Sequence, residues 1–398
     1  MLVSVITLMV SACAGGSGSA PRPDTTSASG TTFDVQVDGV TPAFNATFAA
    51  YFPDSLSVHG GDTIVFRSVF RGNPHTVTLG TLVDQGLTAY EQAAAAAPAP
   101  GGGGAGGYGP AGSVDDHTIP QLAAIPDLMP AGGGDFNQAV AQPCFLDTGL
   151  PPGPGPTPCP KRSQPPFDGR QSFYNSGWLA GGATFTVPLA GDIAPGTYRY
   201  MCAMHRTDMT GSFTVVPGHG STYPEKDFPV NLARMQLQGQ SDGLLPTVQS
   251  ARPKTPQTVD AGVASPLVDG PLAAVFVPGE ITIPVGGTVT WNLVGPQDIA
   301  FNPPSCASPD VTRAADGSVR ANPLAWNDVG LSPPTAAAPA NSAVTVAAFI
   351  WGGTGFVNTG VFNSPAMIRI TFTKPGVYTY QSLIHTGMTA QVVVSGSP

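Results

Sequence analysis

Charged residues are scarce in this 398-residue chain, which holds 16 lysines and arginines against 25 aspartates and glutamates. They make up 10% of the residues, where roughly 25% is usual in soluble proteins. Long helical patterns with glutamate and lysine faces are nearly absent. There is no basic run or patch, so we predict no nucleic-acid partner. The net charge of −9 fits a secreted or extracytoplasmic protein.

Glycine and proline are abundant instead, with 50 and 43 residues, and 41% of the chain is hydrophobic. This apolar content is sufficient for buried cores, and the chain length is typical of two domains. So many turn-forming residues, together with few helical patterns, favour an all-β protein with turns and long loops.

Two segments of the chain look like copies of one unit. "LSVHGGDTIVF" and "ITIPVGGTVTW" each combine an apolar run, a Gly-Gly turn and an alternating strand. Further on, both copies contain an N-[ST]-G sequence, a strand, a P-G-x-Y-x-Y turn and strand, a short loop with histidine and methionine, and a last strand. We therefore predict two Greek-key β-sandwich domains.

The composition shifts along the chain predict the domain boundaries. The first domain is expected at residues 31–217, interrupted by a long Gly/Pro-rich loop insertion at about 84–170, and the second at 271–398. Glycines in the insertion do not follow a strand and open a helix, so they predict a flexible loop, not a phosphate cradle. Residues 218–270 are polar and proline-rich, which indicates a linker with a hint of order around 228–237.

The first residues indicate export. Residues 1–13, "MLVSVITLMVSAC", form an apolar run that is too short to span a bilayer and is typical of a signal peptide. The "VSAC" ending resembles the lipobox of bacterial lipoproteins, which makes Cys13 a lipidation candidate. Residues 14–30 are a flexible tether. No basic residue precedes the apolar run, so an ordinary secretory signal is the alternative to a lipid anchor at the extracytoplasmic face of a bacterial membrane.

The remaining cysteines have different expected roles. Cys144 and Cys159 flank a proline-rich loop, and in an oxidising compartment they are candidates for a disulfide that closes it. Cys306 has no obvious partner. Cys202 lies in "YRYMCAMHRTDMTGSFTV", between two strand-like runs.

The stretch around Cys202 carries a soft set of metal ligands. Cys202, His205 and Met209 share one tight loop, and a thiolate with imidazole and thioether suits copper. A second imidazole is offered by His75 in "GNPHTVTL". Taken singly, each residue has a commoner explanation, such as a buried small side chain, a turn residue or a core methionine. Their order on a sandwich frame favours a copper site.

These residues resemble the blue copper proteins, the cupredoxins of the plastocyanin and azurin family. The resemblance covers roughly residues 31–217 apart from the insertion. It implies one type 1 copper, with His75, Cys202 and His205 as strong equatorial ligands and Met209 as the weak axial ligand.

The resemblance also implies where electrons would enter. In the family the histidine of the loop, here His205, is a solvent-near electron port ringed by an apolar patch, for which Met204 and Pro74 are candidates. Met204 is also the rival of Met209 as axial ligand, although its place between Cys202 and His205 makes it more often point away.

In the second copy the corresponding positions hold no thiolate. Ser382 replaces the cysteine, Asp298 or Gln297 replaces the first histidine, and only His385 and Met388 remain. We expect this domain to lack a copper site and to serve as a structural, docking or spacing module.

The functional prediction is an extracytoplasmic electron carrier that is not an enzyme. A buried and filled copper site has no open position for substrate. The six histidines form no H-x-H pair of the kind multicopper oxidases use, and no G-x-S-x-G elbow points to a hydrolase. The redox partner protein cannot be named. The alternatives are a copper carrier or buffer without redox traffic, and a structural or interaction protein built on two sandwiches.

Overall fold

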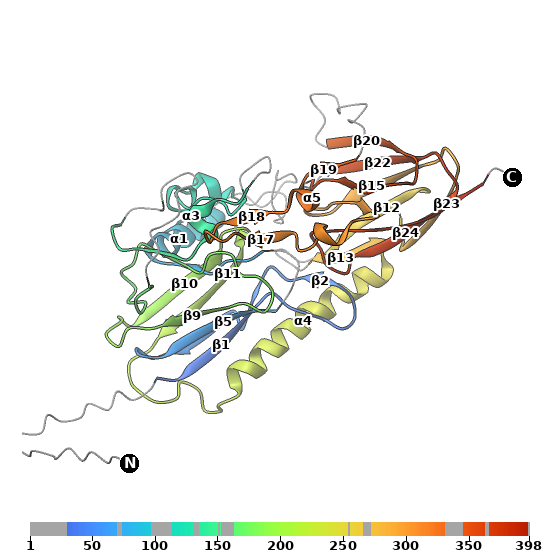
Figure 1. Cartoon of the computed structure of the whole chain (residues 1–398). Coiled ribbons are helices and arrows are strands. Elements are labelled where there is room, and N and C mark those ends of the chain that lie inside the picture. Colours follow the sequence, from blue (N-terminus) through green and yellow to red (C-terminus); the bar gives the residue numbers. More distant parts are fainter. Residues whose placement is uncertain are drawn as a thin grey trace, which may run out of the picture.

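The computed structural model describes most of the chain and places two β-sandwiches side by side (Figure 1). The described residues are 30–69, 74–96, 114–129, 135–149, 152, 163–253, 255–265, 272–330, 345–362 and 366–396. Cys13, the predicted signal peptide and most of the predicted tether therefore lie outside the described residues, as does Cys159. Among the described helices, none is both long and apolar enough to cross a membrane.

The first domain packs a four-stranded sheet against a six-stranded sheet. The smaller sheet has the order β3 (Tyr51–Phe52), β1 (Thr32–Val37), β5 (Thr63–Ser68) and β9 (Thr184–Pro188). The larger has the order β4 (Ser55–Val58), β11 (Arg206–Val215), β10 (Gly196–Cys202), β6 (Thr78–Leu79), β8 (Phe173–Asn175) and β7 (Cys144–Leu146). The alternating burial of β1 and β9 matches their alternating apolar residues.

The second domain also packs two sheets together, and each has six strands. One sheet has the order β2 (Ala46–Thr47), β13 (Leu272–Val277), β12 (Thr258–Ala264), β15 (Thr288–Leu293), β22 (Ala366–Phe372) and β20 (Thr345–Trp351). The other has the order β14 (Glu280–Pro284), β24 (Thr389–Ser395), β23 (Gly376–Gln381), β16 (Ala300–Phe301), β21 (Val357–Thr359) and β19 (Asp328–Val329). A hairpin of β17 (Val311–Arg313) and β18 (Val319–Ala321) is added.

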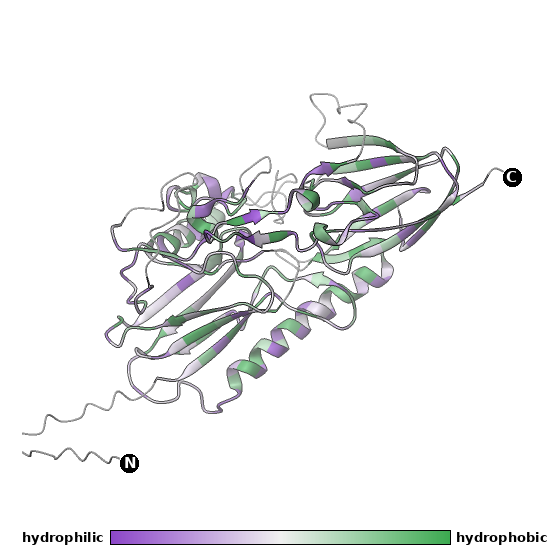
Figure 2. Cartoon of the chain, in the orientation of Figure 1, coloured by the Kyte–Doolittle hydropathy of each residue, from purple (hydrophilic) through white to green (hydrophobic). Residues whose placement is uncertain are grey.

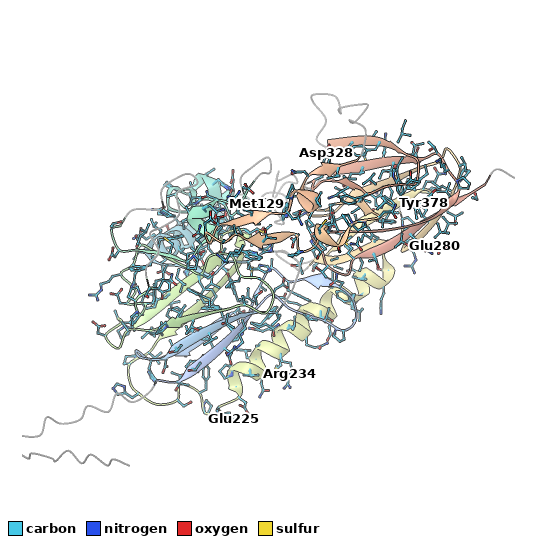
Figure 3. All side chains as sticks on the ribbon, viewed as in Figure 1. Met129, Glu225, Arg234, Glu280, Asp328 and Tyr378 are labelled. Atoms are coloured by element: carbon cyan, nitrogen blue, oxygen red, sulfur yellow. The ribbon has the colours of Figure 1, made fainter. Side chains whose placement is uncertain are left out.

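The six-stranded sheet of the first domain, from β4 to β7, matches the second-domain sheet from β14 to β19 strand for strand. Equivalent aromatic side chains fill the two cores: Phe66 and Trp291 from the alternating strands, and Tyr200 and Tyr380 from the P-G-x-Y-x-Y strands, are all buried. Apolar residues line both sandwiches (Figure 2), and side chains occupy the space between the sheets (Figure 3). The predicted all-β fold of two sandwiches is confirmed.

The expected linker, residues 218–270, contains a long helix and also β12, which is a strand of a second-domain sheet. α4 (Phe228–Ser250) has Asp227 before its first residue and Pro229 in its first turn, where proline is tolerated. The helix runs past both sandwiches (Figure 1), and Leu244 is buried in a cluster that both domains share. The helix could not be predicted from the sequence, because glycines and the internal Pro246 disfavour a helix. Its residues also show no strong amphipathic pattern.

The described part of the insertion is also folded, which differs from the expected loop. It contains α1 (Thr81–Ala96), a 3₁₀ helix η1 (Asp116–Thr118), α2 (Pro120–Ala123), α3 (Gln138–Ala141) and β7. These elements form an apolar cluster with Leu122, Val140 and Met201, which extends to Val311 and Val319 of the second domain. Gln138 also exchanges hydrogen bonds of 2.7 and 3.0 Å with the backbone of Val319. The insertion thus joins the two domains.

Candidate metal centre

The end of β10 and the start of β11 place the candidate ligands. The pairing of these strands is irregular between Met201 and Cys202, and Cys202 then lies opposite Arg206. Arg206 has a φ of 51°, so the chain turns back sharply just after His205. On the neighbouring segment, the backbone of His75 forms an isolated bridge in which Leu179 donates to its carbonyl at 2.8 Å.

The structure brings three of the predicted residues together. The ligand atoms of His75, Cys202 and His205 all lie within 4.8 Å of one another, and these residues are 0%, 0% and 5% exposed. Nδ1 of His75 is 4.0 Å from Sγ of Cys202, and the centroids of the two imidazole rings are 4.9 Å apart. These residues could hold a metal ion, and their assignment as ligands stays a prediction.

The two methionines occupy different environments. Met209 is fully buried in the apolar cluster that contains Cys202, whereas Met204 is only partly buried at the edge of that cluster. Met209 therefore remains the predicted axial ligand.

The environment of Cys202 favours its thiolate. Burial alone would raise the pKa of Cys202, but the charge of His205 and hydrogen bonds with His205 and His75 lower this pKa well below its usual value. The backbone N–H groups of Thr76 and Met204 donate to Sγ at 3.3 and 3.4 Å. A thiolate is the form that binds metals, so the site is prepared for a soft cation.

His75 has a buried partner that the sequence did not reveal. Burial lowers its pKa, but hydrogen bonds with Asp38 and Cys202 raise it to about 9 in total. Oδ2 of Asp38 lies 2.8 Å from Nε2 of His75, and neither side chain is exposed. Asp38 stands in "VDGVTP", and an Asp-Gly pair ordinarily signals only a turn.

The insertion fixes the loop that carries His205. Arg206 is 6% exposed and donates to Asp116 at 2.9 Å, to Asp127 at 2.8 Å and to the carbonyls of Ile125 and Leu122. Buried charges of this kind are stable when they are paired and hydrogen-bonded. The strand return after His205 is therefore anchored in the insertion.

The surroundings of His205 differ from the predicted solvent-near electron port. His205 is 5% exposed, Pro74 is buried and Met204 is partly buried. The backbone N–H of Leu128, in the insertion, donates to the carbonyl of Ala203 at 3.1 Å. His205 is thus a buried residue, because the chain that was expected to be a loop packs over the ligand loop.

Backbone register decides which residue of the second domain takes the place of His75. His75 bridges to Leu179, and Gln297 bridges to Phe362 in the same way. Leu179 and Phe362 both lie four residues after the asparagine of N-[ST]-G. Gln297 therefore corresponds to His75, and Asp298 corresponds to the residue that follows it.

Asp298 fills the remainder of the second site. In the first domain, Oγ1 of Thr76 accepts a hydrogen bond of 2.7 Å from the N–H of Ala203. In the second, Oδ1 of Asp298 accepts from the N–H of Leu383 at 2.9 Å and from the hydroxyl of Ser382 at 2.6 Å. A hydroxyl bonded to a carboxylate thus occupies the position of the thiolate.

The histidine and methionine that remain in the second domain are both buried, with His385 at 0% and Met388 at 1% exposed. Nδ1 of His385 is 3.4 Å from Oγ of Ser382. Burial lowers the pKa of His385 to about 4, against an opposing effect of the charge on Asp38. A first-domain carboxylate therefore lies close enough to influence the second-domain histidine.

The other cysteines are placed as follows. Cys144 is disulfide-bonded, and its predicted partner Cys159 lies outside the described residues. Cys306 is exposed with a free thiol.

A second group of possible ligands, Asp115, Asp116 and His117, lies in the insertion and is partly exposed. Asp116 in this group is already paired with Arg206 at 2.9 Å.

Comparisons with known proteins give likenesses in fold only. No family model and no curated protein matches the chain. An auracyanin from Roseiflexus castenholzii is 18% identical, covers 47% of this chain and 98% of its own, and has a TM-score of 0.21. A purple cupredoxin from Nitrosopumilus maritimus is 18% identical and covers 35% of this chain and 98% of its own, with a TM-score of 0.18. The predicted resemblance to cupredoxins is confirmed at the level of fold.

Copper enzymes are also among the structural neighbours. A copper-containing nitrite reductase from Thermus scotoductus is 12% identical and covers 92% of this chain and 68% of its own, with a TM-score of 0.20. Multicopper oxidases cover the same share of this chain. The prediction that the chain is not an enzyme is therefore wrong as drawn. The absence of H-x-H pairs argues only against the kind of additional copper centre that multicopper oxidases build from such pairs. It does not exclude catalysis.

Proposed function

We propose that the first domain binds one copper ion in a type 1 site and that the chain passes single electrons through it. The proposed ligands are His75, Cys202 and His205, with Met209 as the weak axial ligand. The observation that carries the proposal is the buried cluster of two imidazoles and one thiolate, whose ligand atoms lie within 4.8 Å of one another.

The donor set fits copper better than the harder cations. Thiolate and imidazole are soft or borderline ligands, and no carboxylate belongs to this cluster. When bound, copper supplies a one-electron couple whose potential depends on the axial ligand and on the groups around the sulfur. The N–H groups of Thr76 and Met204 stabilise the negative charge on Sγ of Cys202. The histidines release their protons when they bind metal.

Single-electron exchange is common to electron carriers and to copper oxidoreductases, and the proposal concerns this shared step. We further propose that a redox protein exchanges electrons with the chain outside the cytoplasm. The disulfide-bonded Cys144 supports an oxidising compartment, and the apolar leader ending in Cys13 supports export with a lipid anchor.

A copper titration of the full chain tests the proposal. We expect an intense visible absorption band that saturates at one copper per chain and is bleached by ascorbate. Cys202→Ala should abolish the band, whereas Cys306→Ala, which removes the other free thiol among the described residues, should leave it unchanged. A folded protein with reduced Cys202 and no band would refute the type 1 site. Stable binding of Cu(I) without colour would instead support a copper carrier or buffer.

A further inference from the structure

We propose that Asp38 is a positioning residue of the metal centre, and that the second domain holds Asp38 in place. The proposal rests on the proposed copper site. It assigns a task to the domain whose own site has been filled by hydrogen bonds, and it is carried by one continuous set of contacts from β13 to His75.

The first step is the contact between Asp38 and His75. Oδ2 of Asp38 lies 2.8 Å from Nε2 of His75, and both side chains are fully buried. An ionised carboxylate only accepts hydrogen bonds, so Nε2 must donate. This fixes the ring so that Nδ1 is the nitrogen that faces Cys202, at 4.0 Å from Sγ. Partners of this kind orient a metal-binding histidine and raise its basicity.

The second step concerns how Asp38 is itself held. Its φ is 62°, a conformation that residues other than glycine seldom adopt. Oδ1 accepts from the N–H groups of Gly39 at 2.6 Å and Phe48 at 2.7 Å, and Oδ2 accepts from the hydroxyl of Thr47 at 3.1 Å. Two of these three donors lie at β2, so the position of the carboxylate depends on the position of that short strand.

The third step is that β2 pairs with the second domain. Ala46 and Thr47 pair with Ala273 and Leu272 of β13, so β2 is the edge strand of a second-domain sheet. Phe48, directly after β2, is buried in the cluster that α4 and β13 share.

Asn45 adds two contacts across the same boundary. Its carbonyl accepts from the N–H of Ala274 at 2.8 Å, and its side-chain amide donates to the carbonyl of Thr386 at 2.8 Å. Thr386 directly follows His385 in the second-domain loop that corresponds to the ligand loop of the first. This loop, which has Ser382 in place of a cysteine, thus holds the segment that contacts a proposed ligand of the first domain.

Helix α4 supports the other end of this segment. Oγ1 of Thr41 is 2.8 Å from Oγ of Ser241, and a Cβ on Gly39 would lie 2.4 Å from Cδ1 of Leu237. Gly39 is therefore in close contact with the helix, and a larger residue there would have to displace the side chains of Leu237 and Phe48 or the turn itself.

The test compares matched variants of the copper-loaded full chain. Asp38→Asn should raise the reduction potential and lower the Cu(II) affinity by about 10- to 100-fold, because it removes a negative charge that stabilises Cu(II) more than Cu(I). Each tenfold change in the preference between the two oxidation states corresponds to about 59 mV. Asp34→Asn is the control, since Asp34 lies on β1, which ends just before Asp38, but is 49% exposed and paired with Arg67; it should shift neither quantity.

Two further variants, Thr47→Val and Asn45→Ala, test the contacts that hold Asp38 from the side of β2. Both should shift the potential in the same direction as Asp38→Asn but by less, and both should change the copper hyperfine splitting in electron paramagnetic resonance. A solely structural role for these residues would lower the unfolding temperature and leave the potential and splitting unchanged. If Asp38→Asn does not fold, Thr47→Val decides, since it removes one donor and keeps the side-chain shape.

The outcomes separate this proposal from the copper assignment. A wild-type chain with the visible band, and variants at 38, 45 and 47 with the wild-type potential and splitting, would overturn the positioning role alone. A wild-type chain without the band would overturn the copper site. A metal-free readout is the Nε2 proton of His75 in nuclear magnetic resonance, which should exchange slowly in the wild type and rapidly in Asp38→Asn. Rapid exchange in the wild type would contradict the proposed hydrogen bond.

Discussion

The two sandwiches share one strand arrangement but differ at the same corner, which in the first domain holds the candidate metal centre. In the first, His75, Cys202 and His205 converge in a buried cluster. In the second, Gln297 and Ser382 stand at the first two positions, and Asp298 accepts hydrogen bonds from the serine hydroxyl and the following backbone. The comparison shows that a hydrogen-bond network fills the second corner, and that a few side chains on a similar backbone distinguish it from the candidate metal site of the first domain.

We expect the largest effect from substitutions that give the second domain the candidate ligands of the first. Gln297→His, Asp298→Thr and Ser382→Cys together give the second domain the side chains of the first, beside its existing His385 and Met388. We expect a second copper per chain and roughly twice the visible absorption in a titration, because thiolate and imidazole are the ligands that select copper.

The double variant that keeps Ser382 is the control, and it should bind one copper per chain. A folded triple variant that still binds one copper would show that the two frames differ in more than these side chains.

The next largest effect concerns the contacts that support the Cys202–Met209 loop and its counterpart in the second domain. Arg206 braces the first loop through Asp116 and Asp127, whereas Thr386 and Gly387 stand at the corresponding turn of the second. Arg206→Met should cost about 3 kcal/mol in the free energy of unfolding, because it leaves buried Asp116 without its partner.

Denaturant unfolding measures this cost. Arg170→Met serves as the control, since Arg170 is 76% exposed and its pair with Asp168 lies at the surface; surface pairs contribute little. Equal stabilities of the two variants would show that the brace is not needed.

The smallest expected effect is a pH dependence confined to the second corner. Burial raises the pKa of Asp298 from 3.8 to about 6, against its hydrogen bonds. The folded state then binds the proton more tightly than the unfolded state. The contribution of this group is fully present below pH 4 and is lost as the pH rises through about 6.

Asp298→Asn should remove this slope, which unfolding curves between pH 4 and pH 7 would show as a difference from the wild type. His385, with its pKa lowered to about 4, acts in the opposite sense in both proteins and so cancels in the comparison. Asp328→Asn, at an exposed position on β19 (Figure 3), should keep the wild-type slope. An unchanged slope in Asp298→Asn would contradict the raised pKa.

The sequence was informative wherever local patterns encode structure. Alternating strands, the N-[ST]-G and P-G-x-Y-x-Y repeats and the spacing of Cys202, His205 and His75 were sufficient to predict two sandwiches and to bring together three candidate ligands. The same patterns left Gln297 and Asp298 as alternatives, because one residue of register cannot be read without strand pairing.

The rest depends on contacts between distant segments. α4 is stabilised by packing on both domains and has little periodicity of its own. The brace on Arg206 joins residues about 80 positions apart, and the contact between Asp38 and His75 spans 37. None of these pairs leaves a mark in a local pattern, so the burial of His205 and the partner of His75 were missed.

The crossing of β2 has a consequence for how this molecule can be divided. By position in the chain, Ala46 and Thr47 belong to the first half, but their backbone hydrogen bonds belong to a sheet of the second. A gene fragment ending after the first half would carry every proposed ligand and yet leave β2 without its neighbour. The two halves repeat one strand pattern, but a sheet of the second is complete only with a strand from the first.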